Sequence, residues 1–130
     1  METTKYAFKT KVNLSYEEAI QKVTEELKKE GFGVLTEIDV KETLKKKIDI
    51  DFKKYKILGA CNPSYAYKAL EMETDIGLML PCNIVVYEEA QEIVVAAIDP
   101  VASMMAVGNN QLGEVAAAIQ NKLKSVIKRL

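Results

Sequence analysis

Residues 76–98 read IGLMLPCNIVVYEEAQEIVVAAI, and this stretch decides the fold. Two apolar runs, 76–87 and 93–98, stand on either side of the polar segment EEAQE at 88–92. This pattern predicts a long strand, a turn and a returning strand, which together make a β-hairpin. Both runs are apolar at nearly every position, which is typical of strands buried on both faces. The hairpin therefore needs a cover on each side, from helices or from a second subunit.

Upstream of this hairpin, residues 55–61 (YKILGAC) predict another apolar strand. It ends at Asn62-Pro63, where asparagine suits the N-cap position and proline suits the first position of a helix. The helix that follows is expected to run to about residue 73.

Downstream of the hairpin, Asp99-Pro100 repeats this combination of a capping residue and a proline and predicts a short helical segment. Gly108 ends that segment, and a long C-terminal helix follows. Its apolar stripe is predicted to consist of Leu112, Val115, Ile119, Leu123, Val126 and Leu130.

The N-terminal half carries clear start and stop signals. Residues 3–12 alternate loosely and predict a first strand. Ser15 and Glu18 form a capping box that predicts the start of a helix, and Gly31 supplies its left-handed C-terminal stop. Residues 34–40 predict a further strand, and a short lysine-rich helix follows it.

These elements follow one another without a linker, so residues 1–130 are expected to form a single domain. Their order predicts an α+β, two-layer fold with a mixed, mostly antiparallel sheet and helices packed on one face. Successive residues of a strand point to opposite faces of the sheet. If helices cover only one face, the residues on the other face, which include Met79, Val85 and Tyr87, would form an exposed apolar patch. Because two-fold dimers are the commonest assemblies, the sequence predicts a homodimer.

Composition excludes several classes of function. Lysine and arginine total 18 against 19 acidic residues, so no basic surface is expected for a nucleic acid or a membrane. The chain has no histidine, which excludes Ser-His-Asp and Cys-His catalysis within it and removes the commonest zinc ligand. No apolar stretch approaches the ~20 residues of a membrane span, and the N-terminus does not resemble a signal peptide.

Two motifs share the dipeptide Cys-Asn, at 61–62 and 82–83, and the chain has no other cysteine. Two cysteines are too few for the disulfide framework of a secreted protein, so we expect free thiols and a soluble, cytoplasmic protein. If the two strands are parallel neighbours joined by a helical crossover, the connection lengths bring Cys82 to the level of Cys61. The sequence therefore predicts that both thiols lie close together on neighbouring strands.

The segments GACNP (59–63), YKALEMETDIGL (67–78), LPCNIVVY (80–87) and AAIDP (96–100) resemble the bacterial and archaeal family called domain of unknown function 302. The resemblance covers essentially the whole chain and implies a compact two-layer α+β fold. It implies no activity, and no catalytic residue or cofactor follows from it. The positions that match the family's marked residues are Cys61, Asn62, Pro63, Pro81, Cys82, Asn83, Asp99 and Pro100.

Three hypotheses about function remain open, and the sequence does not decide whether the protein is an enzyme. The first is a small-molecule or anion-binding module whose candidate ligand-binding residues are Asn62, Pro63, Asn83 and Asp99. The second is a thiol-based metal-binding or redox protein that uses Cys61 and Cys82, with Cu(I), or with zinc completed by Asp99 or a partner chain. The third is a structural or interaction homodimer without a ligand site. In the simplest interpretation of the cysteines, both are small buried core residues.

Overall fold

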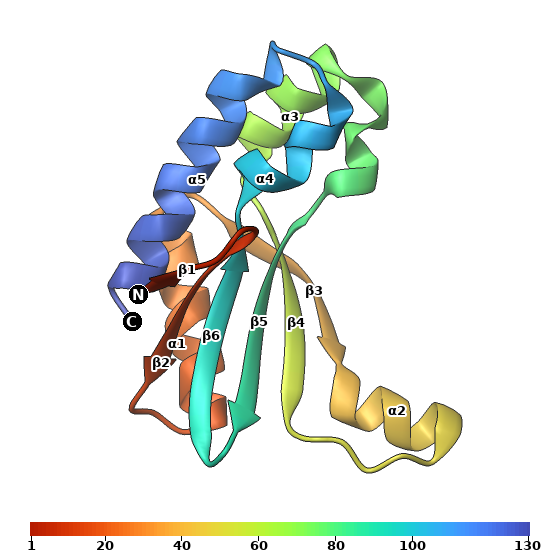
Figure 1. Cartoon of the computed structure of the whole chain (residues 1–130), viewed down its shortest axis with the longest axis vertical. Helices are drawn as coiled ribbons and strands as arrows, with labels where there is room; N and C mark the ends of the chain where they lie inside the picture. The colour runs from red at the N-terminus through yellow and green to blue at the C-terminus, as the bar shows by residue number, and fades with distance from the viewer.

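A six-stranded antiparallel sheet in the order β1-β2-β6-β5-β4-β3 organises the computed structural model, which describes all residues 1–130 (Figure 1). Every neighbouring pair of strands is antiparallel. The strands are β1 (Glu2–Thr3), β2 (Ala7–Val12), β3 (Gly33–Asp39), β4 (Tyr55–Cys61), β5 (Cys82–Glu89) and β6 (Glu92–Ile98). The helices are α1 (Tyr16–Lys29), α2 (Val40–Ile48), α3 (Pro63–Met72), α4 (Pro100–Met104) and α5 (Leu112–Lys128), with the 3-10 turns η1 (Thr74–Met79) and η2 (Met105–Val107). The predicted α+β fold with a mostly antiparallel sheet is confirmed.

The hairpin that decides the fold lies at the centre of the sheet. Strands β5 and β6 pair directly, with Val85 opposite Ala96, and Ala90 and Gln91 form the turn with positive φ angles of 52° and 66°. Strand β2 adds to β6 on one side, and β4 adds to β5 on the other. Because two further strands flank this hairpin, its backbone groups are hydrogen-bonded on both edges.

The first apolar run does not form one long strand, and this part of the prediction was wrong. Residues Thr74–Met79 form η1, a cis peptide bond joins Leu80 to Pro81, and β5 begins only at Cys82. Pro81 has no N–H to donate to a strand ladder. Of the apolar residues before it, Ile76 is buried in the core, whereas Leu78 and Met79 are exposed. A short apolar run has the same appearance in a 3-10 turn and in a strand, so periodicity alone did not separate them.

The parallel arrangement that the connection-length argument assumed for the two cysteine-bearing strands is absent, because β4 and β5 are antiparallel. After β4 the chain passes through α3 and η1, both of which lie beyond the same end of the sheet (Figure 1). The two elements return the chain to the end that it left, so β5 starts beside the end of β4 and runs back. The connection lengths alone fitted either direction.

Helices α1 and α5 cover one face of the sheet, as the sequence predicted for its helices. The capping box at the start of α1 is present: Ser15 Oγ accepts a hydrogen bond from Glu18 N–H at 3.1 Å, and Ser15 N–H donates to Glu18 Oε1 at 3.0 Å. Gly31 follows α1 with φ 87°, which is the predicted left-handed stop. The capping signals of the sequence therefore predict both ends of α1 correctly.

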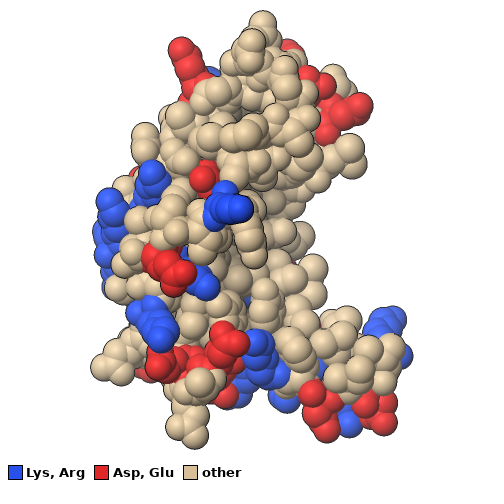
Figure 2. Space-filling model, viewed as in Figure 1, with Lys and Arg blue, Asp and Glu red and all other residues tan.

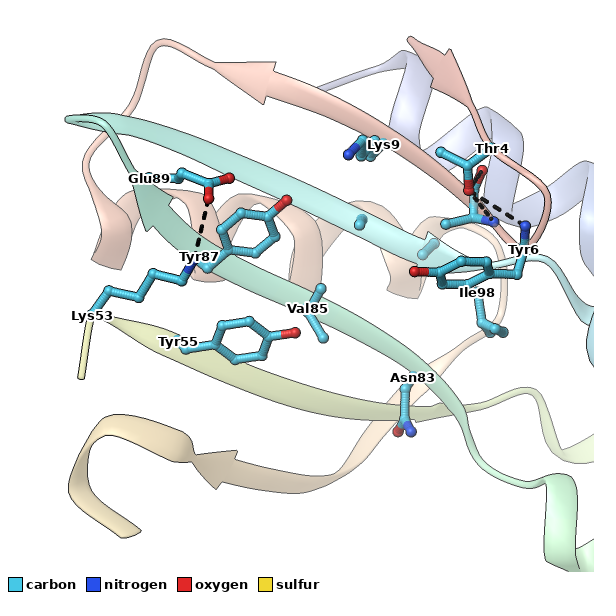
Figure 3. Close-up of a pocket in the computed structure, with 13 residues that line it drawn as sticks. Thr4, Tyr6, Lys9, Lys53, Tyr55, Asn83, Val85, Tyr87, Glu89 and Ile98 are labelled. Carbon is cyan, nitrogen blue, oxygen red and sulfur yellow. Dashed lines mark hydrogen bonds and ion pairs between the residues drawn. The ribbon is translucent and has the colours of Figure 1, made fainter. Parts of the chain in front are cut away.

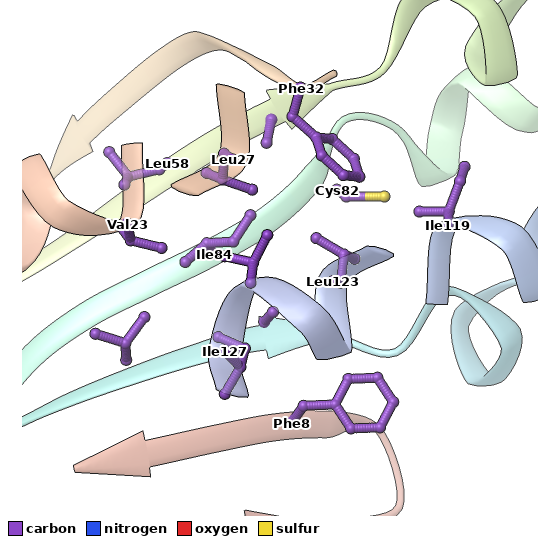
Figure 4. Packing of buried hydrophobic residues seen from close by; sticks show 14 of the residues in the cluster. Phe8, Val23, Leu27, Phe32, Leu58, Cys82, Ile84, Ile119, Leu123 and Ile127 are labelled. Carbon is purple, nitrogen blue, oxygen red and sulfur yellow. The ribbon is translucent and has the colours of Figure 1, made fainter. Parts of the chain in front are cut away.

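Side chains from both helices interdigitate with those of one sheet face (Figure 4). The C-terminal helix α5 contributes seven buried residues, and Leu123 at its centre is fully buried. The fully buried large side chains include Phe8, Val23, Leu27, Leu58, Ile76, Ile84, Val86, Val95, Leu123, Val126 and Ile127. None of the helices is long and apolar enough to cross a membrane.

An ion pair between a buried carboxylate and an exposed arginine joins α1 to the end of α5. The side chain of Glu26 is 3% exposed, and its Oε2 lies 2.7 Å from Arg129 Nε. Lys29 Nζ lies 2.9 Å from Glu26 Oε1. Hydrogen bonds from Lys29 and from Arg129 lower the pKa of Glu26 to about 2, so this carboxylate is charged throughout the neutral range.

Candidate functional site

An apolar pocket of about 300 Å³ lies at the end of the sheet where β4 ends and β5 begins. Helix α3 and η1 form one wall, and α4 and α5 contribute Met104 and Ile119 from the other side. The lining residues are Phe32, Leu35, Ala60, Cys61, Asn62, Tyr65, Ala66, Ala69, Leu70, Gly77, Leu80, Pro81, Cys82, Met104 and Ile119. Twelve of these fifteen are hydrophobic and none is charged, so the pocket suits an uncharged, apolar ligand and not an anion.

Both cysteines line this pocket, and both are free. Cys82 opens β5 opposite Ala60, and Cys61 is the next residue of β4, so the prediction of neighbouring strands is confirmed with the opposite strand direction. Burial, with a smaller contribution from the charge of Cys61, raises the pKa of the Cys82 thiol to about 11. At neutral pH, Cys82 is therefore a protonated thiol with the character of a small core residue.

Asn62 has a different role from the predicted helix cap. No side-chain capping hydrogen bond is present at the start of α3. Instead, Asn62 Nδ2 donates to the backbone oxygen of Glu30 at 3.1 Å, and it lies against Gly31, where a Cβ would stand 3.2 Å from Nδ2. Asn62 thus ties the entry of α3 to the exit of α1 at the rim of the pocket. Pro63 occupies the predicted first helical position, exposed and outside the pocket lining.

The other two candidate ligand-binding residues lie elsewhere. Asn83 is exposed on the opposite face of the sheet from Cys82, because successive strand residues point to opposite faces. Asp99 caps α4 as predicted, accepting a hydrogen bond from Val101 N–H at 2.9 Å and another from Gln120 Nε2 at 3.0 Å. Asn62 and Asn83 line different pockets, and neither Pro63 nor Asp99 lines either of them.

Sequence reasoning missed Gly59, which lies in β4 directly against Pro81, one of the residues that line the pocket. A Cβ there would stand 2.7 Å from Pro81 Cγ and closer still to Thr36 Oγ1. Only a residue without a side chain permits this close approach of β3 and the Pro81 turn to β4. An isolated glycine inside the apolar strand YKILGAC is the signal that could have identified it.

The face of the sheet opposite α1 and α5 has no helical cover (Figure 1), and Figure 3 shows the residues that line a pocket on it. We call this surface the open face, and a shallow pocket of about 430 Å³ lies on it. The rings of Tyr55 and Tyr87 stack there at 5.4 Å with an interplanar angle of 11°. Lys53 Nζ lies 5.2 Å from the Tyr87 ring and 3.4 Å from Glu89 Oε1. The residues that line this pocket are Thr4, Tyr6, Ala7, Lys9, Lys53, Tyr55, Asn83, Val85, Tyr87, Glu89, Ala96, Ala97 and Ile98.

A metal site would need a cluster of ligands. No group of three or more cysteine, aspartate or glutamate side chains lies close enough together to hold a metal ion. The two cysteines are the only thiol ligands in the chain. A metal held there would need further ligands from a second chain or from solvent.

Comparison with known proteins agrees with this fold. The model of the family described as domain of unknown function DUF302 matches residues 8–130. The chain is also similar to the crystal structure of an uncharacterized conserved protein DUF302 from Bacillus stearothermophilus, with 33% sequence identity and a TM-score of 0.89. That similarity covers 95% of this chain and 96% of the other. No curated protein matches the sequence.

Proposed function

The chain belongs to the family described as domain of unknown function DUF302, and we propose that it binds a small, uncharged, largely apolar molecule beneath α3. The family's description names no activity, so the proposal is drawn from the pocket. Membership confirms the family resemblance that the sequence motifs predicted. It adds nothing about the ligand, so the proposal rests on the pocket between β4, β5 and α3.

The observation that carries the proposal is the chemistry of the lining. Small-molecule sites are typically concave and of roughly 300–1,000 Å³, lined by apolar side chains with a few polar groups that fix orientation. The pocket beneath α3 lies at the lower end of that range, and Asn62 at its rim supplies an amide. Leu35 and Leu70 also line it and are exposed, so the pocket communicates with solvent through an apolar mouth.

Binding of indole, followed by NMR spectroscopy, tests this proposal. We expect indole to shift the methyl resonances of Ile119 and Leu80, which line the pocket, and to leave Val94 on the other side of the sheet unchanged. The substitution Ala66→Leu fills the pocket and should abolish these shifts. Ala106→Leu adds the same side chain at an exposed position outside the pocket and should leave binding unchanged.

Two results would overturn the proposal. One is the absence of any shift at Ile119 and Leu80 at millimolar indole. The other is equal binding by Ala66→Leu and the wild type, which would place the contact elsewhere.

A specific observation also favours a homodimer, with the open face as its interface. That face presents half-buried apolar side chains from β4, β5 and β6, including Ile57, Val85 and Ile98, and no helix of the same chain packs on it. Apolar patches of this kind on monomeric proteins are usually limited to a few hundred Å². Pairing two copies through the same patch is the commonest way to bury one.

Light scattering tests the dimer directly. At micromolar concentration we expect twice the chain mass of 14.5 kDa. Val85→Lys and Ile57→Lys place a charge at the centre of the open face and should give the monomer mass. Leu78→Lys, at an exposed residue of η1, is the matched control and should remain a dimer. A wild-type monomer would end the dimer proposal without affecting the pocket.

The thiol-based alternative receives less support from this structure. A metal or redox role for Cys61 and Cys82 would need a thiolate, whereas burial keeps Cys82 protonated at neutral pH. Cytoplasmic location stays a prediction that rests on the free thiols.

A further inference from the structure

A projecting segment, residues 38–52, contains no fully buried residue. We call it the arm; it contains the end of β3, all of α2 and the irregular stretch before β4. None of the nine residues of α2 is buried, and Ile38, Ile48 and Ile50 are 48%, 58% and 47% exposed. In Figure 1 the arm extends from the β3 edge of the sheet, away from α1 and α5.

An isolated helix of nine residues is marginal in water, because helices in proteins gain most of their stability from packing an apolar face. Helix α2 has such a face: Val40, Leu44 and Ile48 recur at intervals of four and so lie on one stripe. Its ends are well formed, since Asp39 accepts a hydrogen bond from Glu42 N–H at 3.0 Å and Asp49 ends the helix in the left-handed conformation. Val40 and Leu44 are half-buried where α2 meets β3 and β4, whereas Ile48 is 58% exposed. Part of the apolar stripe of the arm is therefore left without a packing partner in its own chain.

The charges of the arm balance, with four lysines and four acidic residues in residues 38–52. Lys45 pairs with Asp49 at 2.8 Å and with Asp51 at 3.4 Å, and Lys46 pairs with Glu42 at 2.6 Å. Because these lysines already have acidic partners within the arm, they form no free basic patch for a nucleic acid or an anionic membrane. What the arm offers to a partner is its apolar stripe.

The apolar surface of the arm continues into the open face. The ring of Phe52, at the end of the arm, lies 6.2 Å from the ring of Tyr55, which in turn stacks on Tyr87. In Figure 2 the surface between the α3 end of the molecule and α2 carries neither acidic nor basic side chains. A partner that covers the open face would therefore meet the arm as part of the same surface.

The size of the open face shows why a dimer would need the arm. Five strands spaced about 4.8 Å apart, with six to seven residues at about 3.4 Å each, give on the order of 500 Å² per protomer. Two such faces bury about 1,000 Å² together, the lower limit for a stable interface. The additional area of two arms would bring the total into the standard range of roughly 1,200–2,000 Å².

We infer that the arm is a dimer clasp, whose apolar stripe packs against a second copy of this chain beside the joined open faces. This inference rests on the dimer proposed above. The occupant is a second copy because the arm is continuous with the open face and because the open faces alone only reach the area that a stable dimer needs.

Hydrogen exchange of the full-length protein, read by mass spectrometry above and below the dimer midpoint concentration, tests the clasp. We expect the amides of residues 42–48 to exchange slowly in the dimer and at least about tenfold faster in the diluted monomer, because a lone nine-residue helix frays. Helix α3, which lies at the far end of the sheet, should exchange equally at both concentrations.

The substitution Ile48→Glu supplies a second measurement. It should raise the dissociation constant of the dimer by about tenfold or more, since it places a charge on the buried stripe. Leu78→Glu, the matched control at an 87% exposed leucine, should leave the constant unchanged. Neither residue is in the core, so both variants should melt like the wild type as monomers.

The possible failures are distinguishable. A wild-type monomer would overturn the dimer and the clasp together. A dimer in which residues 42–48 exchange freely, or in which Ile48→Glu has no effect on the dissociation constant, would leave the open-face dimer standing and overturn the clasp.

Discussion

Helices α5 and α2 have the same kind of sequence and opposite surroundings. Both repeat apolar residues every three or four positions. Yet α5 buries seven residues against the sheet and its neighbours, whereas α2 buries none. The difference teaches that periodicity predicts a helix and its apolar face, while the place of the helix in the topology decides whether that face finds a partner within the chain.

The largest expected effect comes from matched truncations in these two helices. Leu123→Ala in α5 removes a fully buried side chain and should lower the free energy of unfolding by about 2–5 kcal/mol, because the transfer energy is lost and a cavity remains. Leu44→Ala in α2 changes a residue that no core side chain covers and should cost less than ~0.5 kcal/mol in the monomer. Chemical denaturation at low protein concentration measures both.

Equal losses for Leu123→Ala and Leu44→Ala would break the comparison, because they would mean that the arm packs as tightly as α5. A denaturation midpoint unchanged by Leu123→Ala would show that α5 does not pack on the sheet.

A smaller effect is expected where β3 leaves the body of the molecule towards the arm. Gly59→Ala would force a Cβ against Pro81 and Thr36 and should destabilise the fold by about 1–3 kcal/mol through overpacking. Gly33→Ala, in the neighbouring strand β3, meets nothing within 4 Å and serves as the control with a near-zero effect. Thermal unfolding measures both, and a neutral Gly59→Ala variant would mean that the contact between β4 and the Pro81 turn is loose.

The smallest expected effect concerns pH and the ion pair that joins α1 to α5. The pKa of Glu26 is about 2 in the folded protein against an ordinary value of 4.5, so between these values the unfolded chain binds more protons than the folded one. The stability that this carboxylate contributes is therefore complete above about pH 4.5 and is lost as the pH falls towards about 2.

Removal of this carboxylate provides the measurement. Glu26→Gln should flatten the dependence of unfolding free energy on pH across that window, whereas Glu25→Gln, at an exposed neighbour, should keep the wild-type slope. Identical slopes for the two variants would show that the bonds to Arg129 and Lys29 do not persist in solution.

Local signals in the sequence were reliable wherever a few neighbouring residues decide the structure. The capping box at Ser15, the stop at Gly31 and the cap at Asp99 are all present as predicted, because each depends on hydrogen bonds or backbone angles within about four residues. The hairpin of residues 82–98 also depends on residues close together in the sequence, since a short turn joins its two strands.

Predictions that depended on the path of the chain through space were less successful. The direction of β5 relative to β4 was wrong, because connection lengths fit both an outward crossover and a return over the same end of the sheet. The candidate ligand-binding residues Asn62 and Asn83 line different pockets, because a strand sends Cys82 and Asn83 to opposite faces. The pocket itself is built by residues from β4, β5, α3, α4 and α5 that no short motif links.

The sequence by itself determined the α+β class, the central hairpin, the helix ends and the family, because these depend on local hydrogen bonding and on the total apolar content of each segment. Only the tertiary structure decided the rest: which sheet face α1 and α5 cover, that Cys61 and Cys82 line one pocket, and that the arm projects without cover. The physical reason is that burial is a property of pairs of elements. An apolar stripe shows that a surface must be covered, but the arrangement of the whole chain determines what covers it.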